Sequence, residues 1–239
     1  MTKDQISWIV LGATLIVAIA FVLIYSRFVK KANFSWIRFI ARVAIFSALS
    51  TILYIVKVFE VHLPFLPPFL ALHFDEIPAF IAGYAYGPYA ALIVILVKTI
   101  IKLPFTSTLA VGELADFLFS CAFVLPATFV YKKIRNLKGV FIGLGISVVL
   151  QVVVAMVMNV YAILPFYIQV MGMTEEMILG MCQKANPSIT NIDWSYAFLA
   201  VLPLNLIKDA IVIVVTFVIY RGIHKTLRWE TEESKEQAI

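Results

Sequence analysis

The chain has 239 residues, of which 62% are hydrophobic and only 14% are charged. A soluble domain is about 45–50% apolar and about 25% charged, so this composition excludes an ordinary soluble enzyme. The formal net charge of +5 comes largely from basic residues in short loops between apolar runs. It therefore indicates membrane topology, and no nucleic-acid partner is expected.

Several apolar runs reach the roughly 18–20 residues that a helix needs to span a bilayer. They lack the alternation of polar and apolar residues that is typical of a membrane β-barrel. The sequence therefore predicts an all-α fold, a polytopic bundle of membrane helices.

Seven spans are expected in chain order. They cover about residues 6–28, 36–58, 75–86, 88–103, 113–131, 139–164 and 196–220. The first span has the alternative of a cleaved signal peptide, with Ala18-Ile19-Ala20 as the cleavage pattern. It is too long for a typical signal peptide and no net positive charge precedes it, so we expect an uncleaved anchor. The span at 75–86 is short for a full crossing, and Gly87-Pro88 joins it tightly to the next.

Three groups of basic residues set the expected topology, and they lie at 27–42, 132–138 and 221–228. Positively charged loops stay on the cytoplasmic side, and seven spans bring all three groups to that side. The N-terminus is then outside and the C-terminus inside. We expect an extra N-terminal transmembrane helix and basic loop at 1–35, a six-helix membrane domain at 36–228, and an acidic, disordered cytoplasmic tail at 229–239.

A polar group inside the last span is the strongest functional signal. Asn205, Lys208 and Asp209 share one broad helix face, and a charge at mid-bilayer costs at least about 2.5–3.5 kcal/mol. That face should point into the bundle, towards a partner side chain or a ligand. Asn159 lies in the outer part of the preceding span, and the apolar, proline-rich loop 59–73 is on the same side. Together they predict an outward-facing pocket for a small molecule.

Alternatives stay open for these residues. Asn159 can serve a helix–helix hydrogen bond, and Lys208 can pair with a charge on another span. The proline-rich loop either lies on the membrane or folds back over a cavity. Lys98 and Lys102 are expected to face Glu113 and Asp116 across a helical hairpin. These four charges form either a structural ion-pair cluster or the acid–base groups of an enzyme. No phosphate-binding loop, HExxH or CxxC motif is present, so no metal, no cofactor and no ATPase activity is expected.

Three blocks of sequence resemble a known family. They read HFDEIPAFIAGYAYGPYAALIVILVK (His73–Lys98), VGELADFLFSCAFVLPATFVYKK (Val111–Lys133) and PLNLIKD (Pro203–Asp209). In this order they resemble the substrate-binding S components of energy-coupling factor (ECF) transporters, most closely the riboflavin-specific branch, over about residues 38–228. The resemblance implies a six-helix bundle in a prokaryotic cell membrane that is not an enzyme. The bundle binds a vitamin from outside and associates with a membrane coupling subunit and two cytoplasmic ATPases.

The resemblance also implies roles for particular residues. Asn159, Asn205 and Lys208 match residues that hydrogen-bond the flavin, and the loop around 63–70, with Leu66, matches the cap over the site. Ala44 and Ala48 match the AxxxA motif that docks on the coupling subunit, although such a pattern also suits packing within one chain. An aromatic-rich pocket suits a flavin ring system, and the candidate ring contacts are Phe65, Phe69, Tyr84 and Phe166.

Two features depart from the family, namely the extra N-terminal helix and a connection at 165–195 that looks longer than usual. Other functions also remain open at this point. They are an S component for another vitamin or flavin, such as FMN or a thiamine-like compound, a membrane-embedded enzyme, and an independent secondary transporter.

Overall fold

The computed structural model describes the backbone of residues 36–106 and 108–236, and side chains within 37–106 and 108–222. The predicted extra helix at 6–28 lies outside the described residues. Helices make up most of the described chain: α2 (Trp36–Ile55), α3 (Glu76–Tyr86), α4 (Pro88–Lys102), α5 (Val111–Lys133), α6 (Leu137–Met158), α7 (Leu164–Gln169), α8 (Glu175–Ala185), α9 (Trp194–Tyr196) and α10 (Leu202–Glu236). The predicted all-α class is confirmed.

Two π-helical turns interrupt the long helices near one end of the bundle. Asn159–Ile163 joins α6 to α7, and Ala197–Val201 joins α9 to α10. Short 3₁₀ turns follow α2 at Lys57–Phe59 and α4 at Leu103–Phe105. Because π-turns are rare and often occur at functional sites, the first of them draws attention to Asn159.

Five stretches of the described chain are long and apolar enough to cross a membrane. They are Ile37–Ile55, Pro88–Phe105, Val111–Lys133, Leu137–Gln169 and Trp194–Gly222, and they coincide with five of the predicted spans. The sixth core helix, α3, has only 11 residues, as the sequence predicted. It contacts α2, α4, α5 and α10 and is buried from Glu76 to Gly83, so it is an internal helix of the bundle.

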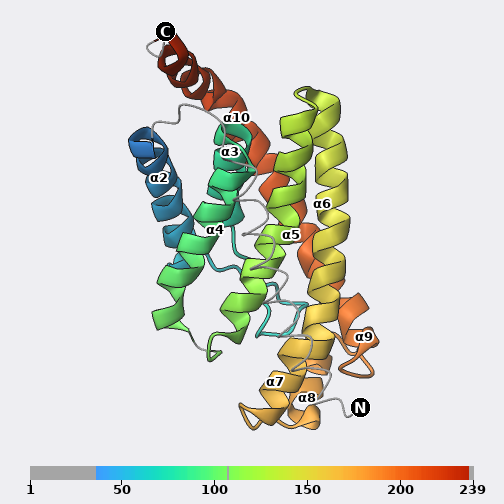
Figure 1. The fold of residues 1–239 in the computed structure, drawn as a ribbon. Coiled ribbons are helices and arrows are strands. Elements are labelled where there is room, and N and C mark those ends of the chain that lie inside the picture. The colour runs from blue at the N-terminus through green and yellow to red at the C-terminus, as the bar shows by residue number, and fades with distance from the viewer. Residues whose placement is uncertain (1–35, 107, 237–239) are drawn as a thin grey trace.

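Figure 1 shows the six core helices side by side, with α7, α8 and α9 gathered at one end of the bundle. We call this the α8 end. The turn between α5 and α6 lies at the opposite end, from which α10 projects. The turn and the helix ends beside it carry the basic residues at 132–138, and we call this the basic end.

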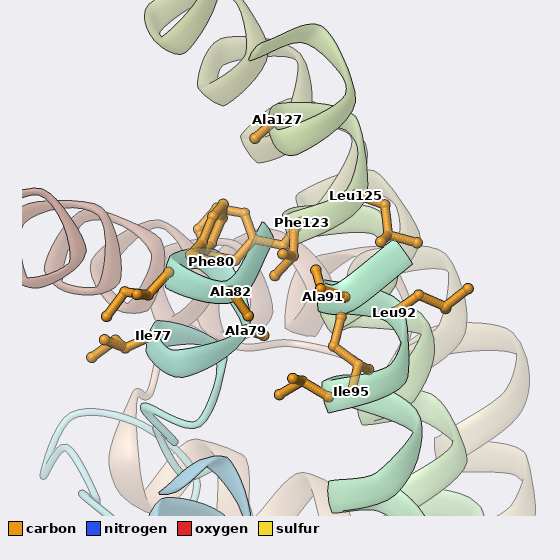
Figure 2. Packing of buried hydrophobic residues seen from close by; sticks show 14 of the residues in the cluster. Ile77, Ala79, Phe80, Ala82, Ala91, Leu92, Ile95, Phe123, Leu125 and Ala127 are labelled. Atoms are coloured by element: carbon orange, nitrogen blue, oxygen red, sulfur yellow. The ribbon is translucent and has the colours of Figure 1, made fainter. Parts of the chain in front are cut away.

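Small residues let α3 pack tightly in the centre. Figure 2 shows Ala79, Phe80 and Ala82 of α3 next to residues of α4 and α5. The ring of Phe80 meets the ring of Phe123 edge-on, with 4.8 Å between centroids. At Gly83 a β-carbon would lie 2.4 Å from the side chain of Thr128, so any larger residue would push α3 and α5 apart.

The proline-rich loop after α2 folds back onto the bundle. Backbone hydrogen bonds of 3.1 and 2.8 Å pair Val61 with Leu72 and close the loop. Leu66 and Leu72 are buried in one apolar cluster with Ile178 and Cys182 of α8. Of the two alternatives for this loop, the structure therefore has the one in which it covers the bundle interior. The connection at 165–195 is also ordered, because α7 and α8 occupy much of it.

The expectation of a disordered tail is wrong for most of its length, because α10 continues as a helix through Glu236. The residues after Arg228 are rich in Glu, a good helix former. Extending a helix that already exists is much easier than nucleating a new one.

Candidate binding site

A cavity of about 690 Å³ opens at the α8 end of the bundle. The end of α2, the folded-back loop, the α4–α5 connection, the first π-turn and α10 all contribute to its wall. Two carboxamides and an ammonium group lie on the side of the first π-turn and α10, and aromatic rings line other parts. The aromatic residues of the wall are Tyr54, Phe69, Phe105, Phe119 and Tyr167.

The structure brings four of the predicted binding residues to this cavity. They are Asn159, Asn205, Lys208 and Phe69. Phe69 also meets the ring of Tyr167 edge-on, with centroids 6.5 Å apart. The predicted hydrogen-bonding trio therefore shares one cavity, and one aromatic residue of the loop covers it.

The other predicted contacts do not line the cavity. Leu66 is buried inside the folded loop, and Phe65 beside it is 48% exposed. Phe166 packs in an apolar cluster with α5 residues such as Val111. Tyr84 lies in the last turn of α3, at the basic end, so the structure excludes it from this cavity. The prediction for Tyr84 rested on aromatic character alone, which says nothing about depth in the membrane.

Asn159 is the first residue of the π-turn after α6. Its amide nitrogen donates to the Ala155 carbonyl at 2.9 Å, and its Oδ1 accepts from the Tyr196 hydroxyl at 3.1 Å. Tyr196 is completely buried at the junction of α9 with the second π-turn. The two bonds fix the orientation of the Asn159 amide at the cavity wall.

Asn205 is held in a similar way within α10. Its Oδ1 accepts from Nε2 of Gln151 at 2.6 Å, and its Nδ2 donates to the Val201 carbonyl at 2.7 Å. Asn205 is only 5% exposed. Because each amide nitrogen has two protons, Asn205 and Asn159 each keep one donor for a ligand.

Lys208 follows Asn205 by one turn and faces the same cavity. Its ammonium donates to Oε1 of Glu76 at 2.6 Å. The alternative that Lys208 pairs with a charge on another span is thus confirmed, and the partner is the first residue of α3. An ammonium has three donors, so this bond leaves Lys208 able to bind a second acceptor.

A second ion-pair group lies beside this one. Lys98 of α4 is completely buried and donates to the carboxylate of Asp75, to Asp116 of α5 at 2.9 Å and to Ser120 at 2.8 Å. The predicted contact between the α4 lysine and α5 therefore forms. Since Lys98 joins α4 to α5 and to the entry of α3, its role in this structure is to hold the helices together.

Lys102 and Glu113 do not complete the predicted cluster. The ammonium of Lys102 lies 5.0 Å from the centroid of the Tyr54 ring. Glu113 accepts from the hydroxyls of Thr106 at 2.7 Å and Thr108 at 3.0 Å. Both residues still line the cavity, where they add polar groups to its rim.

Oxygens of Asp75, Glu76 and Asp116 lie within 4.8 Å of one another, a spacing that would suit a metal ion. Lys98 and Lys208 already donate to these three carboxylates. Two ammonium groups therefore balance most of the negative charge, and these ion pairs explain why the three carboxylates lie close together.

Sequence reasoning missed two residues of the cavity region. They are Glu76 and His73, and both lie within the block His73–Lys98 without a role predicted for either. The signal for Glu76 was available, because an ionisable residue at the edge of an apolar span usually has a partner inside the bundle. His73 lines the cavity, and burial lowers its pKa below the ordinary value, so that it is neutral at pH 7.

Ala44 and Ala48 lie on α2, and both are exposed. Ala44 and Ala48 therefore do not pack against another helix within the described part of this chain. Ile45 and Leu49 beside them are 61% and 48% exposed, so this helix face is apolar as well as open.

Comparisons with known proteins match most of the chain to one family. Residues 38–220 match the family model described as "ECF transporter, substrate-specific component". The chain is 31% identical over 187 residues to "Riboflavin transporter RibU" of Staphylococcus aureus (strain TCH60), covering 78% of this chain and 92% of that protein. It is 26% identical over 185 residues to "Riboflavin transporter FmnP" of Bacillus subtilis (strain 168), covering 76% and 90%.

A solved structure also matches. It is described as "Structure and mechanism of the S component of a bacterial ECF transporter", and it superimposes with a TM-score of 0.63 at 27% sequence identity. The match covers 80% of this chain and 97% of that chain.

Proposed function

Because the chain belongs to the family of substrate-specific components of ECF transporters, we propose that it captures riboflavin from outside the cell and releases it inside. The chain is a transport component and not an enzyme. Riboflavin is then its cargo, and no cofactor is implied. Both curated relatives described above are named as riboflavin transporters, which supports this choice of ligand.

One observation carries the proposal: a single cavity combines hydrogen-bonding side chains on one side with aromatic rings around it. A flavin has a flat ring system with carbonyls and ring nitrogens along one edge. The free donors of Asn159, Asn205 and Lys208 suit that edge, and Phe69 and other rings suit its flat apolar surface. This arrangement also supports the residue roles that the family resemblance implied.

The charges around the cavity favour a neutral ligand. Three lysines and three carboxylates line it, so their formal charges cancel. They are Lys57, Lys102, Lys208, Glu60, Glu113 and Asp116. A phosphorylated flavin would bring close to two negative charges without a matching excess of lysines, so riboflavin should bind better than FMN.

The orientation and the partners belong to the same proposal. The basic residues at 132–138 support an orientation in which that end of the bundle lies in the cytoplasm of a prokaryotic cell and the cavity faces outside. The N-terminus is then outside, provided that the span at 6–28 crosses the membrane. The exposed apolar face around Ala44 and Ala48 fits docking on a membrane coupling subunit that works with two cytoplasmic ATPases.

The experiment is a competition series on the purified chain in detergent. Riboflavin fluorescence is titrated with protein, and FMN and thiamine then compete for the site. The proposal predicts saturable quenching by one riboflavin per chain, with FMN weaker and thiamine inactive. Preference for thiamine or FMN would keep the S-component assignment and change the vitamin. Ion-coupled uptake in vesicles that lack an ATPase partner would instead indicate a secondary transporter.

A further inference from the structure

A second cavity, of about 280 Å³, lies at the basic end of the bundle. It shares no lining residue with the first cavity. Its wall is built by α3, α5, α6 and α10 and by the turn between α5 and α6. The wall is mostly apolar, with Phe80, Leu144 and Ile213 among its residues, so it suits a hydrocarbon group.

The position of three tyrosines suggests the depth of this cavity in the membrane. The ring of Tyr84 meets Tyr131 edge-on at 5.2 Å between centroids and lies 5.9 Å from Tyr220. All three line the cavity. Tyrosines concentrate where the hydrocarbon core meets the headgroups, so the cavity mouth lies at that level.

The cavity also opens to the side of the bundle. Phe217 and Leu137 belong to its wall, and they are 48% and 64% exposed. In a membrane span, this exposed surface faces lipid. A chain from the surrounding bilayer can therefore enter the cavity without passing through water.

Basic residues flank the rim of the cavity in the sequence. Asn136 and Leu137 line it, and they stand in sequence between Arg135 and Lys138. Lys132 precedes them at the end of α5, and all three basic residues are exposed. Basic pockets between membrane helices at this level are typical sites for anionic lipid headgroups.

Two buried hydroxyls in the wall add a polar requirement. The Tyr84 hydroxyl and Oγ1 of Thr216 have no hydrogen-bond partner among the described residues. A buried polar group without a partner is unfavourable, so a ligand with acceptors fits better than a pure hydrocarbon. The ester groups of a glycerolipid provide such acceptors next to the acyl chain.

We propose that this cavity holds an acyl chain of an anionic phospholipid whose phosphate is bound by Arg135 and Lys138, with Lys132 nearby. The lipid would fix the basic end of the bundle to one leaflet of the membrane. This site is separate from the substrate cavity and does not depend on which vitamin the protein carries.

The test is native mass spectrometry of the full chain purified in detergent, with dioleoylphosphatidylglycerol and dioleoylphosphatidylcholine as probes. We expect the wild type to retain phosphatidylglycerol in preference. The double variant Arg135→Gln/Lys138→Gln should lose that preference, by about fivefold for each removed charge. Val140→Trp, which fills the cavity, should reduce retention of both lipids. Lys184→Gln, an exposed lysine at the α8 end, is the matched control and should change nothing.

Thermal melting of each variant shows that it is folded, and the milder Leu144→Phe replaces Val140→Trp if that variant is not. The proposal is overturned if the wild type shows no preference for phosphatidylglycerol. It is also overturned if lipid retention is unchanged in both the charge-removing and the cavity-filling variants. If only Arg135→Gln/Lys138→Gln loses the preference for phosphatidylglycerol and the cavity-filling variant keeps its lipid, the headgroup binds without insertion of the acyl chain. This result would also overturn the proposal. If the variants retain lipid as the wild type does but co-purify less of the coupling subunit, the cavity would be assigned to a protein partner instead.

Discussion

The ammonium of Lys208 lies 2.6 Å from Oε1 of Glu76 and joins α10 to the first turn of α3 beside the cavity. Both side chains are almost completely buried, at 7% and 0% exposure. The lysine that is proposed to bind the ligand is therefore oriented by a carboxylate from the central helix. This pair links the stability of the bundle to the substrate site.

Removing one partner of this pair should be costly. Lys208→Met leaves Glu76 buried without its partner, and breaking a buried pair in this way costs about 3–5 kcal/mol. The substitution should also remove the proposed charged hydrogen bond to the ligand, worth about 1.5–3 kcal/mol, so riboflavin affinity should fall more than about tenfold. The double variant Lys208→Met/Glu76→Gln should recover stability but not affinity. Melting curves and fluorescence titrations measure the two effects, and a double variant no more stable than Lys208→Met would contradict the pairing.

Lys98 should matter for stability. Lys98→Met removes the bonds to Asp75 and Asp116 and leaves one buried and one partly buried carboxylate without an ammonium. We expect a loss of about 3–5 kcal/mol in the free energy of unfolding. Lys102→Met is the matched control, because Lys102 is only partly buried, and its loss should stay within about 1 kcal/mol. Equal melting temperatures for the two variants would show that the buried network does not hold the helices.

Acid should destabilise the protein through His73. Burial lowers the pKa of His73 in the folded chain, while the unfolded chain keeps the ordinary value of about 6.5. The folded state then binds fewer protons, so stability is lost as the pH falls below about 6.5. His73→Gln should remove this part of the pH dependence. His62→Gln, whose side chain is 49% exposed, is the control, and a pH profile unchanged by His73→Gln would refute the assignment.

The α2 face should serve transport without serving binding. Ala44→Trp places a large side chain on the exposed surface of α2, so it should block a partner helix and leave the cavity intact. Uptake by cells that hold the complete transporter should fall strongly, while the purified variant binds riboflavin as the wild type does. Val149→Trp, on a 65% exposed position of α6, is the control for a bulky residue in lipid. Loss of binding in Ala44→Trp, or equal uptake by both variants, would rule out this division of roles.

The fold was predictable from the sequence because membrane spans have a strong signal. Long apolar runs and basic loops gave the helices of the core, including the short α3, whose end is marked by Gly87-Pro88. Gly87 adopts a φ of +97°, which only glycine does easily. The helical continuation of α10 was missed, because a polar, charged sequence alone does not distinguish a disordered tail from the extension of an existing helix.

The site was predictable only in part. Asn159, Asn205 and Lys208 stood out because polar groups in apolar spans need a reason, and the structure puts them on one cavity. Phe65, Phe166 and Tyr84 were chosen as aromatic residues alone, and composition does not tell which way a ring points. The π-turn that orients Asn159 has no recognisable pattern in the sequence.

Riboflavin binding is tested most directly by an absorbance scan of the chain purified in detergent without added ligand. We expect a yellow chromophore that remains through purification, is released by denaturation and is identified as riboflavin, in an amount that Lys208→Met strongly reduces. A colourless protein that also leaves the fluorescence of added riboflavin unquenched would contradict it. The fold and the family would then stand, and the ligand would have to be another vitamin.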